Sequence, residues 1–486
     1  MENQAYRGHV FALPYPSQGH INPLLQFCNR LVSKGLKASL ATTLYIHNTM
    51  QPQSSSSLQF DTISDGYDEG GFAQAESIHA YLNRMETIGS KTLADLIIKN
   101  KNTANPIDCI IYDPFLPRAL EVAKKFGIFG AAFFTQTCAV NFIYYHVHHG
   151  LLKLPIASTP ISIPGLPVLE LEDMPSYISV PGSYPAYFEM VLNQFSSSDK
   201  ADAVLTNTFY ELDPEADSMS KVCRLLPIGP TIPSFYLDKR LENDNDYGLS
   251  LFVSDSSVCN NWLNTKPEGS VIYASFGSMA CLTNKQMEEL AFALKGCKFH
   301  FLWVVKASEE AKLPEKFVEE IGNKGLVVQW CSQLEVLSNK AIGCFLTHCG
   351  WNSILEALSL GVPTMGVPQW TNQTTNAKYV QDVWKVGVRA KVCENGIVER
   401  EEIEFCIKEV MKGERGKDFL EKAKKWRDLA IKAGSEGGSS DKNIDEFVSK
   451  FKTPNLIDYV LFFRCNNLNS GCSLRTESLF TFFFYL

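Results

Sequence analysis

A turn crowded with polar side chains, His348 to Ser353, stands directly before an apolar helical pattern. A short strand pattern, Gly343 to Leu346, leads into it. The first N–H groups of a helix have no partner within the helix, so its N-terminus favours a phosphate group. His348, Asn352 and Ser353 would add further donors, and Gly350 would let the backbone approach a ligand closely. The pattern predicts a site for a diphosphate.

Two simpler explanations exist for this turn. Asn352 and Ser353 could serve only as helix N-caps, and Trp351 could be an ordinary core residue. A metal site built on Cys344, His348 and Cys349 is disfavoured, because neighbouring residues on one turn do not give tetrahedral spacing and no second ligand pair follows. We therefore expect no metal.

A second candidate pair, His20 and Asp113, follows two strand patterns that are far apart in the sequence. In a doubly wound sheet of order 3-2-1-4-5, strands 1 and 4 are neighbours, and ligands bind beyond their C-terminal ends. This order would place His20 beside Asp113. A carboxylate that orients an imidazole forms a general base. As an alternative, His20 could be a turn residue at a helix start, and Asp113 with Pro114 a plain turn.

The same order applies to the second half of the chain, where strand 1 ends in the sequence SFGSMA. Ser278 of that sequence should then face the His348 turn. In each half, the candidate site residues would thus lie beyond the C-terminal ends of the central strands of its sheet.

The elements that must position these residues alternate between strand and helix patterns, which predicts parallel sheets with helices on both faces. The expected strands are His9–Tyr15, Lys37–Thr42, Phe60–Ile63, Ile107–Tyr112, Gly130–Phe134, Ala203–Thr206, Leu225–Ile228, Ser270–Phe276, Phe299–Val305, Leu326–Gln329, Gly343–Leu346 and Pro363–Val367. The expected helices include Asn22–Lys34, Ser77–Lys99, Pro117–Lys125, Glu401–Met411 and Phe419–Ala433. Pro155 to Pro185 is expected to be loop.

These patterns divide the chain into two Rossmann-like domains that face one cleft. We expect an N-terminal domain at residues 1–240, a linker at 241–257 and a C-terminal domain at 258–452, whose last helices could pack back on the N-terminal domain. Residues 453–486 have no clear helical period and are expected to be a disordered tail.

Composition narrows the function classes. The 486 residues carry a net charge of −8, which argues against nucleic acid or an anionic membrane as the main partner. No apolar run is long enough for a signal peptide or a spanning helix, and the 14 cysteines show no framework spacing. We expect a cytoplasmic protein without stable membrane insertion.

The sequence lacks several common catalytic motifs. It has no GxGxxG, no Walker lysine motif and no GxSxG. A Rossmann oxidoreductase is therefore disfavoured although still testable by nicotinamide binding, and a serine hydrolase is disfavoured as well.

One long stretch, Trp330 to Gln373, reads WCSQLEVLSNKAIGCFLTHCGWNSILEALSLGVPTMGVPQWTNQ. It strongly resembles the signature of plant secondary-product glycosyltransferases, the plant family 1 UDP-glycosyltransferases. The similarity runs from about His9 to Lys452, through PSQGHINPLLQF, IIYDPFLPRALEVAKKFG, GSVIYASFGSMA and GGSSDKNIDEF. It looks closest to the subgroup that glucosylates small carboxylic acids, terpenoids and steroids. The resemblance implies an α/β protein with the GT-B fold.

The resemblance also implies residue roles. His20 would be the base, and Asp113 its partner. The residues that would bind the UDP-sugar are Trp330 at the uracil with Gln333 nearby, Glu356 at the ribose, Ser278, His348, Asn352 and Ser353 at the diphosphate, and Trp351, Asn372 and Gln373 at the sugar. Cys331 is expected to belong to the same donor site. The family usually has an acidic residue where this chain has Asn372, which weakens the expectation of glucose as the donor sugar.

The implied reaction is an inverting transfer of glucose from UDP-glucose to a hydroxyl or carboxyl group. The acceptor would be a small lipophilic molecule of plant secondary metabolism, such as a terpenoid, a steroid, a phenolic or a small acid, and the product a β-glucoside or a glucose ester. We expect a monomer that needs no metal or other cofactor. The alternative is a catalytically silent protein that binds nucleotide sugars, which the presence of both His20 and Asp113 disfavours.

The acceptor pocket should come from the first half of the chain and be largely apolar. The candidate lining residues are Phe115, Phe134, Gln136, Phe142, Tyr145 and His146.

Overall fold

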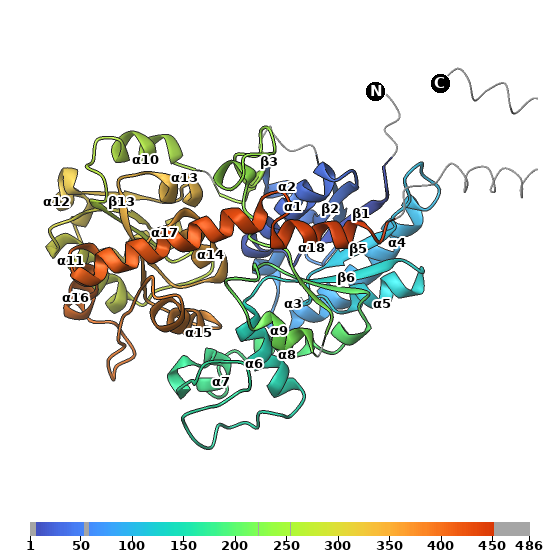
Figure 1. The fold of residues 1–486 in the computed structure, drawn as a ribbon, viewed down its shortest axis with the longest axis horizontal. Helices are drawn as coiled ribbons and strands as arrows, with labels where there is room; N and C mark the ends of the chain where they lie inside the picture. The colour runs from blue at the N-terminus through green and yellow to red at the C-terminus, as the bar shows by residue number, and fades with distance from the viewer. Residues whose placement is uncertain (1–5, 53–57, 222, 253, 452–486) are drawn as a thin grey trace, which may run out of the picture.

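Parallel sheets form the centre of both halves of the chain. The structure is a computed structural model and describes residues 6–52, 58–221, 223–252 and 254–451. The first sheet has the order β4-β2-β1-β5-β6-β7-β8 and the second has the order β12-β11-β10-β13-β14-β15. The predicted order, with strands 1 and 4 as neighbours, is therefore confirmed in each sheet, and the two sheets lie in separate lobes (Figure 1).

The strands of the first sheet are β1 (His9–Leu13), β2 (Lys37–Thr43), β4 (Gln59–Ile63), β5 (Cys109–Tyr112), β6 (Phe129–Phe134), β7 (Ala203–Thr206) and β8 (Leu225–Pro227). Those of the second are β10 (Val271–Ser275), β11 (His300–Val304), β12 (Gly325–Val328), β13 (Ile342–Thr347), β14 (Thr364–Gly366) and β15 (Gly387–Arg389). A small antiparallel pair joins β3 (Gln51–Pro52) to β9 (Leu249–Ser250).

The central strands are largely apolar and buried along their whole length, because both faces of each sheet are covered. Every residue of β1, β5 and β10 is buried. The register aligns the strand ends: Leu13 pairs with Tyr112 in the first sheet, and Ser275 pairs with Thr347 in the second. The loops that follow these strands therefore begin level with one another, and this alignment brings the site residues together.

Helices cover both sheets. In the first half they are α1 (Gln18–Ser33), α2 (Leu44–Thr49), α3 (Ile78–Arg84), α4 (Ser90–Asn100), α5 (Arg118–Lys125), α6 (Cys138–His148), α7 (Ser176–Ser179), α8 (Pro185–Asn193) and α9 (Ala216–Ser220). In the second half they are α10 (Ser256–Leu263), α11 (Asn284–Gly296), α12 (Phe317–Ile321), α13 (Gln333–Ser338), α14 (Trp351–Leu360), α15 (Gln373–Lys378), α16 (Arg400–Met411), α17 (Glu414–Gly434) and α18 (Ser439–Val448).

Two expectations about helices need correction. The single helix expected at Ser77–Lys99 is interrupted by a π-helical turn, Met85–Gly89, between α3 and α4. The segment expected to be loop, Pro155 to Pro185, contains the one-turn helix α7, and α8 begins at Pro185. Proline fits the first turn of a helix because its missing N–H is not needed there.

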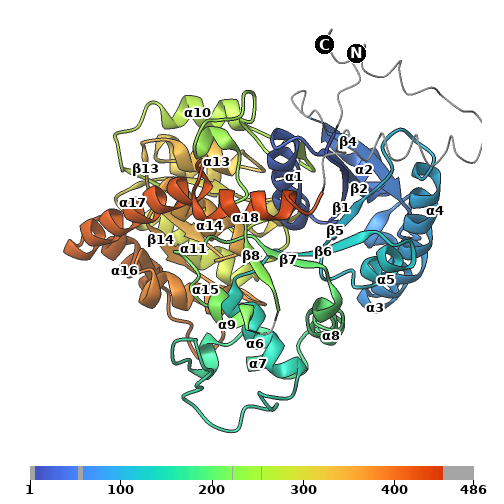
Figure 2. The same ribbon diagram turned by 45° about the vertical axis from the view of Figure 1, so that its right-hand side comes forward.

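The last helix returns to the N-terminal domain. Figures 1 and 2 show α17 and α18 passing from the C-terminal lobe to the side of α1. Ile444, Phe447 and Val448 of α18 belong to the same buried cluster as Val10 and Leu24 of the first sheet and α1. The sequence pattern did not predict α18. The expected tail at residues 453–486 lies outside the described residues.

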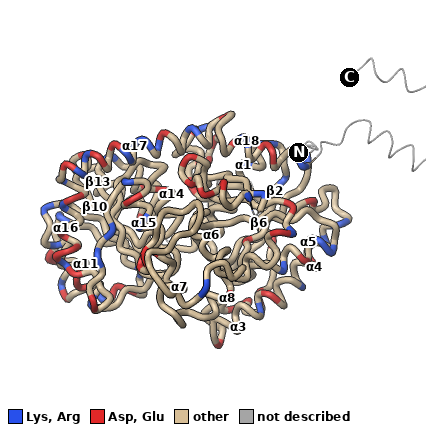
Figure 3. Tube along the Cα trace, turned by 60° about the horizontal axis from the view of Figure 1, so that its bottom comes forward, with Lys and Arg blue, Asp and Glu red and all other residues tan. Residues whose placement is uncertain are grey.

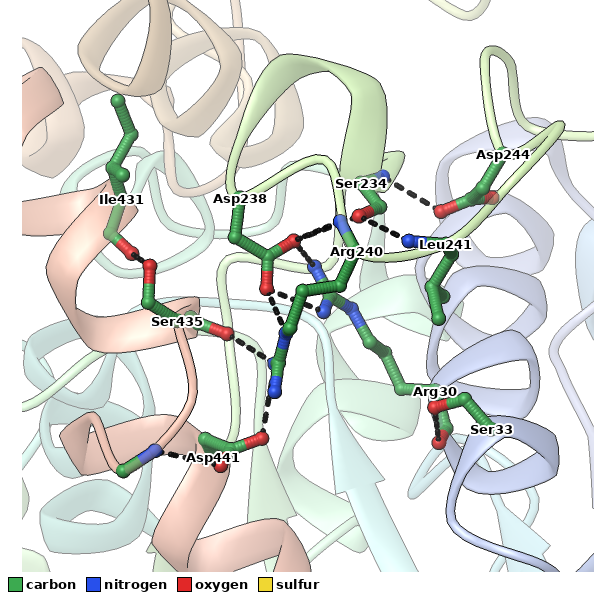
Figure 4. A network of polar contacts seen from close by, with 12 residues as sticks. Arg30, Ser33, Ser234, Asp238, Arg240, Leu241, Asp244, Ile431, Ser435 and Asp441 are labelled. Carbon is green, nitrogen blue, oxygen red and sulfur yellow. Dashed lines mark hydrogen bonds and ion pairs between the residues drawn. The ribbon is translucent and has the colours of Figure 1, made fainter.

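The segment between the domains is held by a charged network (Figure 4). Arg30 of α1 makes two hydrogen bonds to Asp238, at 3.1 and 3.2 Å, and Ser234 Oγ donates to the same carboxylate at 2.7 Å. Arg240 contacts Asp238 as well and reaches Asp441 of α18 at 3.0 Å. Burial raises the pKa of Asp238, but its bonds to Arg30, Ser234 and Arg240 outweigh burial and lower the pKa to about 2. The network ties α1, residues 234–240 just before the linker, and α18 into one unit.

Charges are mixed on the surface. Figure 3 shows basic and acidic residues interspersed along α11, α16 and α17, whereas the region around α6 and α7 carries few charges. Within the part of the chain that the structure describes, no helix combines the length and the apolar character needed to cross a membrane.

Candidate active site

A cavity of about 330 Å³ lies between the two domains, beside the loops that follow β1, β5, β6, β10 and β13. It therefore occupies the edge of the sheets at which the sequence predicted the chemistry. The predicted site residues that line it are His20, Phe115, Gln136, Ser278, Trp330, Cys331, Gln333, His348, Trp351, Asn352, Ser353, Glu356, Asn372 and Gln373.

The predicted pair of His20 and Asp113 is in contact. His20 lies in the first turn of α1, and Asp113 directly follows β5, the neighbour of β1. The distance from His20 Nδ1 to Asp113 Oδ2 is 2.5 Å. Asp113 is buried, and its other oxygen accepts a hydrogen bond from the N–H of Phe115 at 3.0 Å. A carboxylate fixed in this way favours the tautomer with its proton on Nδ1, which leaves Nε2 as a proton acceptor.

The ring of His20 is also held by its aromatic neighbours. Its centroid lies 5.5 Å from the ring of Tyr15 and 5.2 Å from that of Phe115. Thr135 Oγ1 lies 3.2 Å from His20 Nδ1. Because packing and hydrogen bonds both restrict the imidazole, its position is set before any substrate arrives.

The helix α14 faces the cavity with its N-terminus. Cys349 adopts a left-handed conformation, with φ of 64°, and Gly350 occupies the N-cap position of the helix. No side chain caps the first turn. The simpler explanation of Asn352 and Ser353 as N-caps is therefore wrong, and the first N–H groups of α14 have no side-chain acceptor. Such a terminus is suited to an anion.

Ser278 and His348 lie on neighbouring loops beside this helix terminus. Gly277 has φ of 71°, and a Cβ atom there would lie 2.8 Å from the ring of His348, so only glycine fits. Burial lowers the pKa of His348 to about 4, so its ring is neutral at pH 7. Lys306 holds the Ser278 loop by donating to the carbonyls of Ser278 at 3.0 Å and Ala280 at 2.7 Å. Sequence reasoning did not identify Lys306, because nothing in its spacing links it to that loop.

At the far end of the cavity Glu356 is bound through both oxygens. Gln333 Nε2 donates to Oε2 at 2.8 Å, and the hydroxyl of Tyr247 donates to Oε1 at 2.7 Å. Burial raises the pKa of Glu356 to about 7, although these two hydrogen bonds act in the opposite direction. Tyr247 lies within the segment expected to be only a linker, and no local pattern marked it as part of the site.

Two predicted residues of α14 connect the domains. Asn352 Nδ2 donates to the carbonyl of Gly19 at 2.6 Å, and the indole N–H of Trp351 donates to the carbonyl of Asn207 at 2.7 Å. Trp351 is buried in a cluster that includes Phe209, so it packs as a core residue and also lines the cavity. The Asn352–Gly19 contact places α1, which carries His20, against the N-terminal turn of α14.

Asn372 and Gln373 stand at the start of α15, and both are buried. Gln373 Oε1 accepts hydrogen bonds from the N–H groups of Gln369 at 2.9 Å and Trp370 at 3.1 Å. The amide nitrogen of Gln373 thus remains as its donor toward the cavity.

The expected acceptor pocket needs correction. Phe142, Tyr145 and His146 do not line the cavity. They lie on α6, where Phe142 and His146 pack at 4.3 Å and Tyr145 packs against Phe195 at 5.8 Å. The part of the cavity formed with the first domain is lined instead by aromatic and apolar residues that sequence reasoning missed. They are Tyr15, Tyr177, Tyr187, Met190, Val191 and Trp370. Phe134 is buried in the core of the first sheet, in contact with Phe195. Aromatic periodicity could not distinguish a helix that lines a cavity from one that packs on a neighbour.

Known proteins are similar to this chain in both fold and sequence. A family model described as "UDP-glucoronosyl and UDP-glucosyl transferase" matches residues 240–425. The crystal structure of Os79 from O. sativa in complex with UDP superimposes with a TM-score of 0.88 at 41% identity, covering 91% of this chain and all of that one. The fold is therefore GT-B.

Curated relatives from plants are similar over nearly the whole chain. Mogroside I-E synthase from Siraitia grosvenorii is 47% identical, covering 91% of this chain and 98% of its own length. UDP-glycosyltransferase 74F2 from Arabidopsis thaliana is 58% identical over 453 residues, 92% of this chain and 99% of its own length. Identity at that level over 92% of the chain means that the chain belongs to the plant family 1 UDP-glycosyltransferases.

Proposed function

We propose that this UDP-glycosyltransferase is an inverting glucosyltransferase that transfers glucose from UDP-glucose to a small lipophilic acceptor. One observation carries the proposal: His20, which is paired with Asp113 in the first domain, and the uncapped terminus of α14 line the same cavity. A base from one domain and an anion site from the other, beside a shared cavity, suit a single displacement between two bound substrates.

The reaction follows from this arrangement. His20 Nε2 takes the proton of the acceptor hydroxyl as the acceptor oxygen attacks the anomeric carbon. The bond from that carbon to the β-phosphate oxygen breaks, and the electron pair leaves with UDP. Asp113 stabilises the imidazolium that forms, and the N–H groups of α14 stabilise the charge that develops on UDP. Attack from the face opposite the leaving group converts an α-linked donor into a β-glucoside.

The cavity supports an apolar acceptor with a hydroxyl group, or with a carboxyl group that would give a glucose ester. Its acceptor side carries Phe115, Tyr177, Tyr187 and Trp370, with Gln136 as a polar group. The relatives' names point to acceptors of similar character: one is a flavonol 7-O-beta-glucosyltransferase from Arabidopsis thaliana, 56% identical over 452 residues. We propose a terpenoid, steroid, phenolic or small acid as the acceptor class.

We also propose that transfer needs no metal. Helix N–H groups and neutral donors are available to stabilise the leaving group. Within residues 6–52, 58–221, 223–252 and 254–451, no three His, Cys, Asp or Glu side chains are grouped as a metal site.

The test is incubation with UDP-glucose and a panel of acceptors, read by mass spectrometry for a hexose gain and by NMR for the anomeric configuration. We expect a β-linked product at the same rate with and without EDTA. An α-linked product would contradict the inverting mechanism, and loss of activity in EDTA would contradict metal independence. UDP binding without a hexose gain on any acceptor would favour the silent binding protein.

Replacement of Asn372 by aspartate is expected to improve the use of UDP-glucose. A carboxylate accepts a sugar hydroxyl with charge assistance that an amide lacks, which is worth about 1 kcal/mol, or roughly fivefold in kcat/KM. Steady-state kinetics with UDP-glucose test this, and Asn323→Asp, at an exposed position outside the cavity, is the control. Unchanged or poorer kinetics of Asn372→Asp would contradict the prediction.

Donor affinity is expected to fall as the pH drops below about 7. The ribose hydroxyls would donate to the ionised carboxyl of Glu356, whose pKa burial raises to about 7. UDP-glucose is the suitable ligand because its diphosphate does not titrate in this range. We expect calorimetry to show binding weaker by up to about tenfold at pH 6 than at pH 8. Glu356→Gln should bind more weakly and lose this pH dependence; an equal dependence in both proteins would refute the assignment.

A further inference from the structure

The segment from Asp246 to Phe252 lies between α1 and the end of the cavity that holds Glu356 and Trp330. On one side it is bound to α1. Gln18 Oε1 accepts the N–H of Leu251 at 3.0 Å, and Gln18 Nε2 donates to the carbonyl of Leu249 at 3.3 Å. Since one amide side chain pairs with both groups, the backbone of this segment has a fixed position relative to α1.

On its other side the segment reaches Glu356. The hydroxyl of Tyr247 donates to Glu356 Oε1 at 2.7 Å, while Gln333 holds Oε2. Burial and the neighbouring Glu356 raise the pKa of Tyr247 well above 10, so its hydroxyl stays protonated and remains a donor. The carboxylate of Glu356 is thereby held in place through both of its oxygens.

The same segment supports Trp330. The ring of Phe252 stacks on the indole, with centroids 4.1 Å apart and an interplanar angle of 30°. Trp330 lines the cavity and Phe252 does not, so Phe252 packs behind the indole. The backbone shortly after this segment is also bound to Trp330, because the N–H of Asp255 donates to the carbonyl of Trp330 at 2.9 Å. An indole supported on one side presents a fixed plane on the other.

We propose that Tyr247 and Phe252 are positioning residues for the nucleoside part of the donor. Tyr247 holds the Glu356 carboxylate where ribose hydroxyls can donate to it, and Phe252 holds the Trp330 indole in the plane on which a base stacks. The segment from Asp246 to Phe252 thus supports the donor site as well as connecting the domains: Tyr247 lines the cavity beside Glu356, and Phe252 packs behind Trp330. This inference rests on the proposed function, because it requires that a uridine nucleotide is the donor.

Tyr247→Phe and Phe252→Ala test the proposal through direct binding of UDP and UDP-glucose by calorimetry. Tyr247→Phe removes one hydrogen bond to a charged group, and we expect affinity to fall about 5- to 10-fold. Phe252→Ala removes the stacked ring, and we expect a loss of about 3- to 10-fold. KM for UDP-glucose should rise by similar factors with kcat nearly unchanged, since neither residue contacts the reacting atoms.

Three readouts separate positioning from general damage. Inorganic pyrophosphate lacks the nucleoside, so its inhibition constant should be unchanged in both variants. Phe252→Tyr keeps the stacked ring and should restore binding. The midpoint of the pH dependence of UDP-glucose binding should rise in Tyr247→Phe, because the carboxyl loses a donor. Tyr236 and Tyr273 also interact electrostatically with Glu356, and their raised pKa values keep both neutral in this range.

The matched control is Tyr210→Phe, which removes an exposed hydroxyl bonded to Asp217 at 3.1 Å. It should leave donor binding unchanged. Equal UDP affinity in wild type, Tyr247→Phe and Phe252→Ala would overturn the inference, as would a parallel loss of pyrophosphate inhibition. If Phe252→Ala does not fold, the proposal is tested by the UDP affinity of Tyr247→Phe and by the midpoint of the pH dependence of its UDP-glucose binding. A wild-type protein that binds no UDP would instead contradict the proposed function itself.

Discussion

Replacing His20 with alanine is expected to lower kcat with a hydroxyl acceptor by about 10²- to 10⁴-fold. The variant loses the group that takes the hydroxyl proton, while the uncapped terminus of α14 and the other donor-side residues remain in place. UDP affinity should therefore be unchanged, so the loss should appear in kcat. Asp113→Asn should also be strongly impaired, because an amide can favour the wrong tautomer of His20.

Stopped-time product assays over a pH range, together with UDP calorimetry, check this prediction. His146→Ala is the matched control, since His146 lies on α6 outside the cavity and its Nδ1 bonds to the carbonyl of Phe142 at 2.8 Å. It should retain normal activity. If His20→Ala kept more than about a tenth of the wild-type kcat with a hydroxyl acceptor, general-base catalysis by His20 would be contradicted.

The acceptor's own charge gives a second check on the same variant. A carboxylic acid is already ionised at neutral pH and needs no base to become a nucleophile. His20→Ala should consequently retain more activity with a carboxylate acceptor than with a hydroxyl acceptor. Equal losses on the two acceptor types would show that His20 contributes through something other than proton removal.

Replacing Asp238 with asparagine is expected to reduce the free energy of unfolding by about 2 to 4 kcal/mol at pH 7. The carboxylate is nearly fully buried and bound by Arg30, Ser234 and Arg240, and asparagine would leave Arg30 buried without its charge partner (Figure 4). Because these contacts join α1, residues 234–240 and α18, we expect the loss to affect the whole molecule.

The contribution of the Asp238 carboxylate to the free energy of unfolding should depend on pH. The pKa of Asp238 falls from 3.8 to about 2 in the folded protein, so its stabilising contribution is complete above about 4 and is lost as the pH falls toward 2. Urea unfolding at several pH values measures it, and the difference between wild type and Asp238→Asn should narrow below about pH 4. Asp428→Asn, which breaks an exposed pair with Arg427, should cost less than about 1 kcal/mol. A constant difference across the pH range would exclude ion pairing as its cause.

The sequence by itself determined the strand order and, through it, the meeting of His20 with Asp113. The reason is general: parallel strands joined by helices have few allowed topologies, so residues at the ends of strands 1 and 4 become neighbours whatever lies between them. The turn before α14 was equally readable, because a helix terminus and its donors are local in the sequence.

Only the tertiary structure decided which side chains surround that centre. Phe142 and Tyr187 are both aromatic residues on short helices, yet α8 carries Tyr187 to the cavity and α6 packs Phe142 away from it. Tyr247 and Phe252 come from a segment without periodicity. Their proposed roles arise from contacts with residues far along the chain: Glu356 is 109 positions from Tyr247, and Trp330 is 78 positions from Phe252. Periodicity and spacing record which face of an element is apolar, but the partner that covers this face is chosen by long-range packing, which no local pattern encodes.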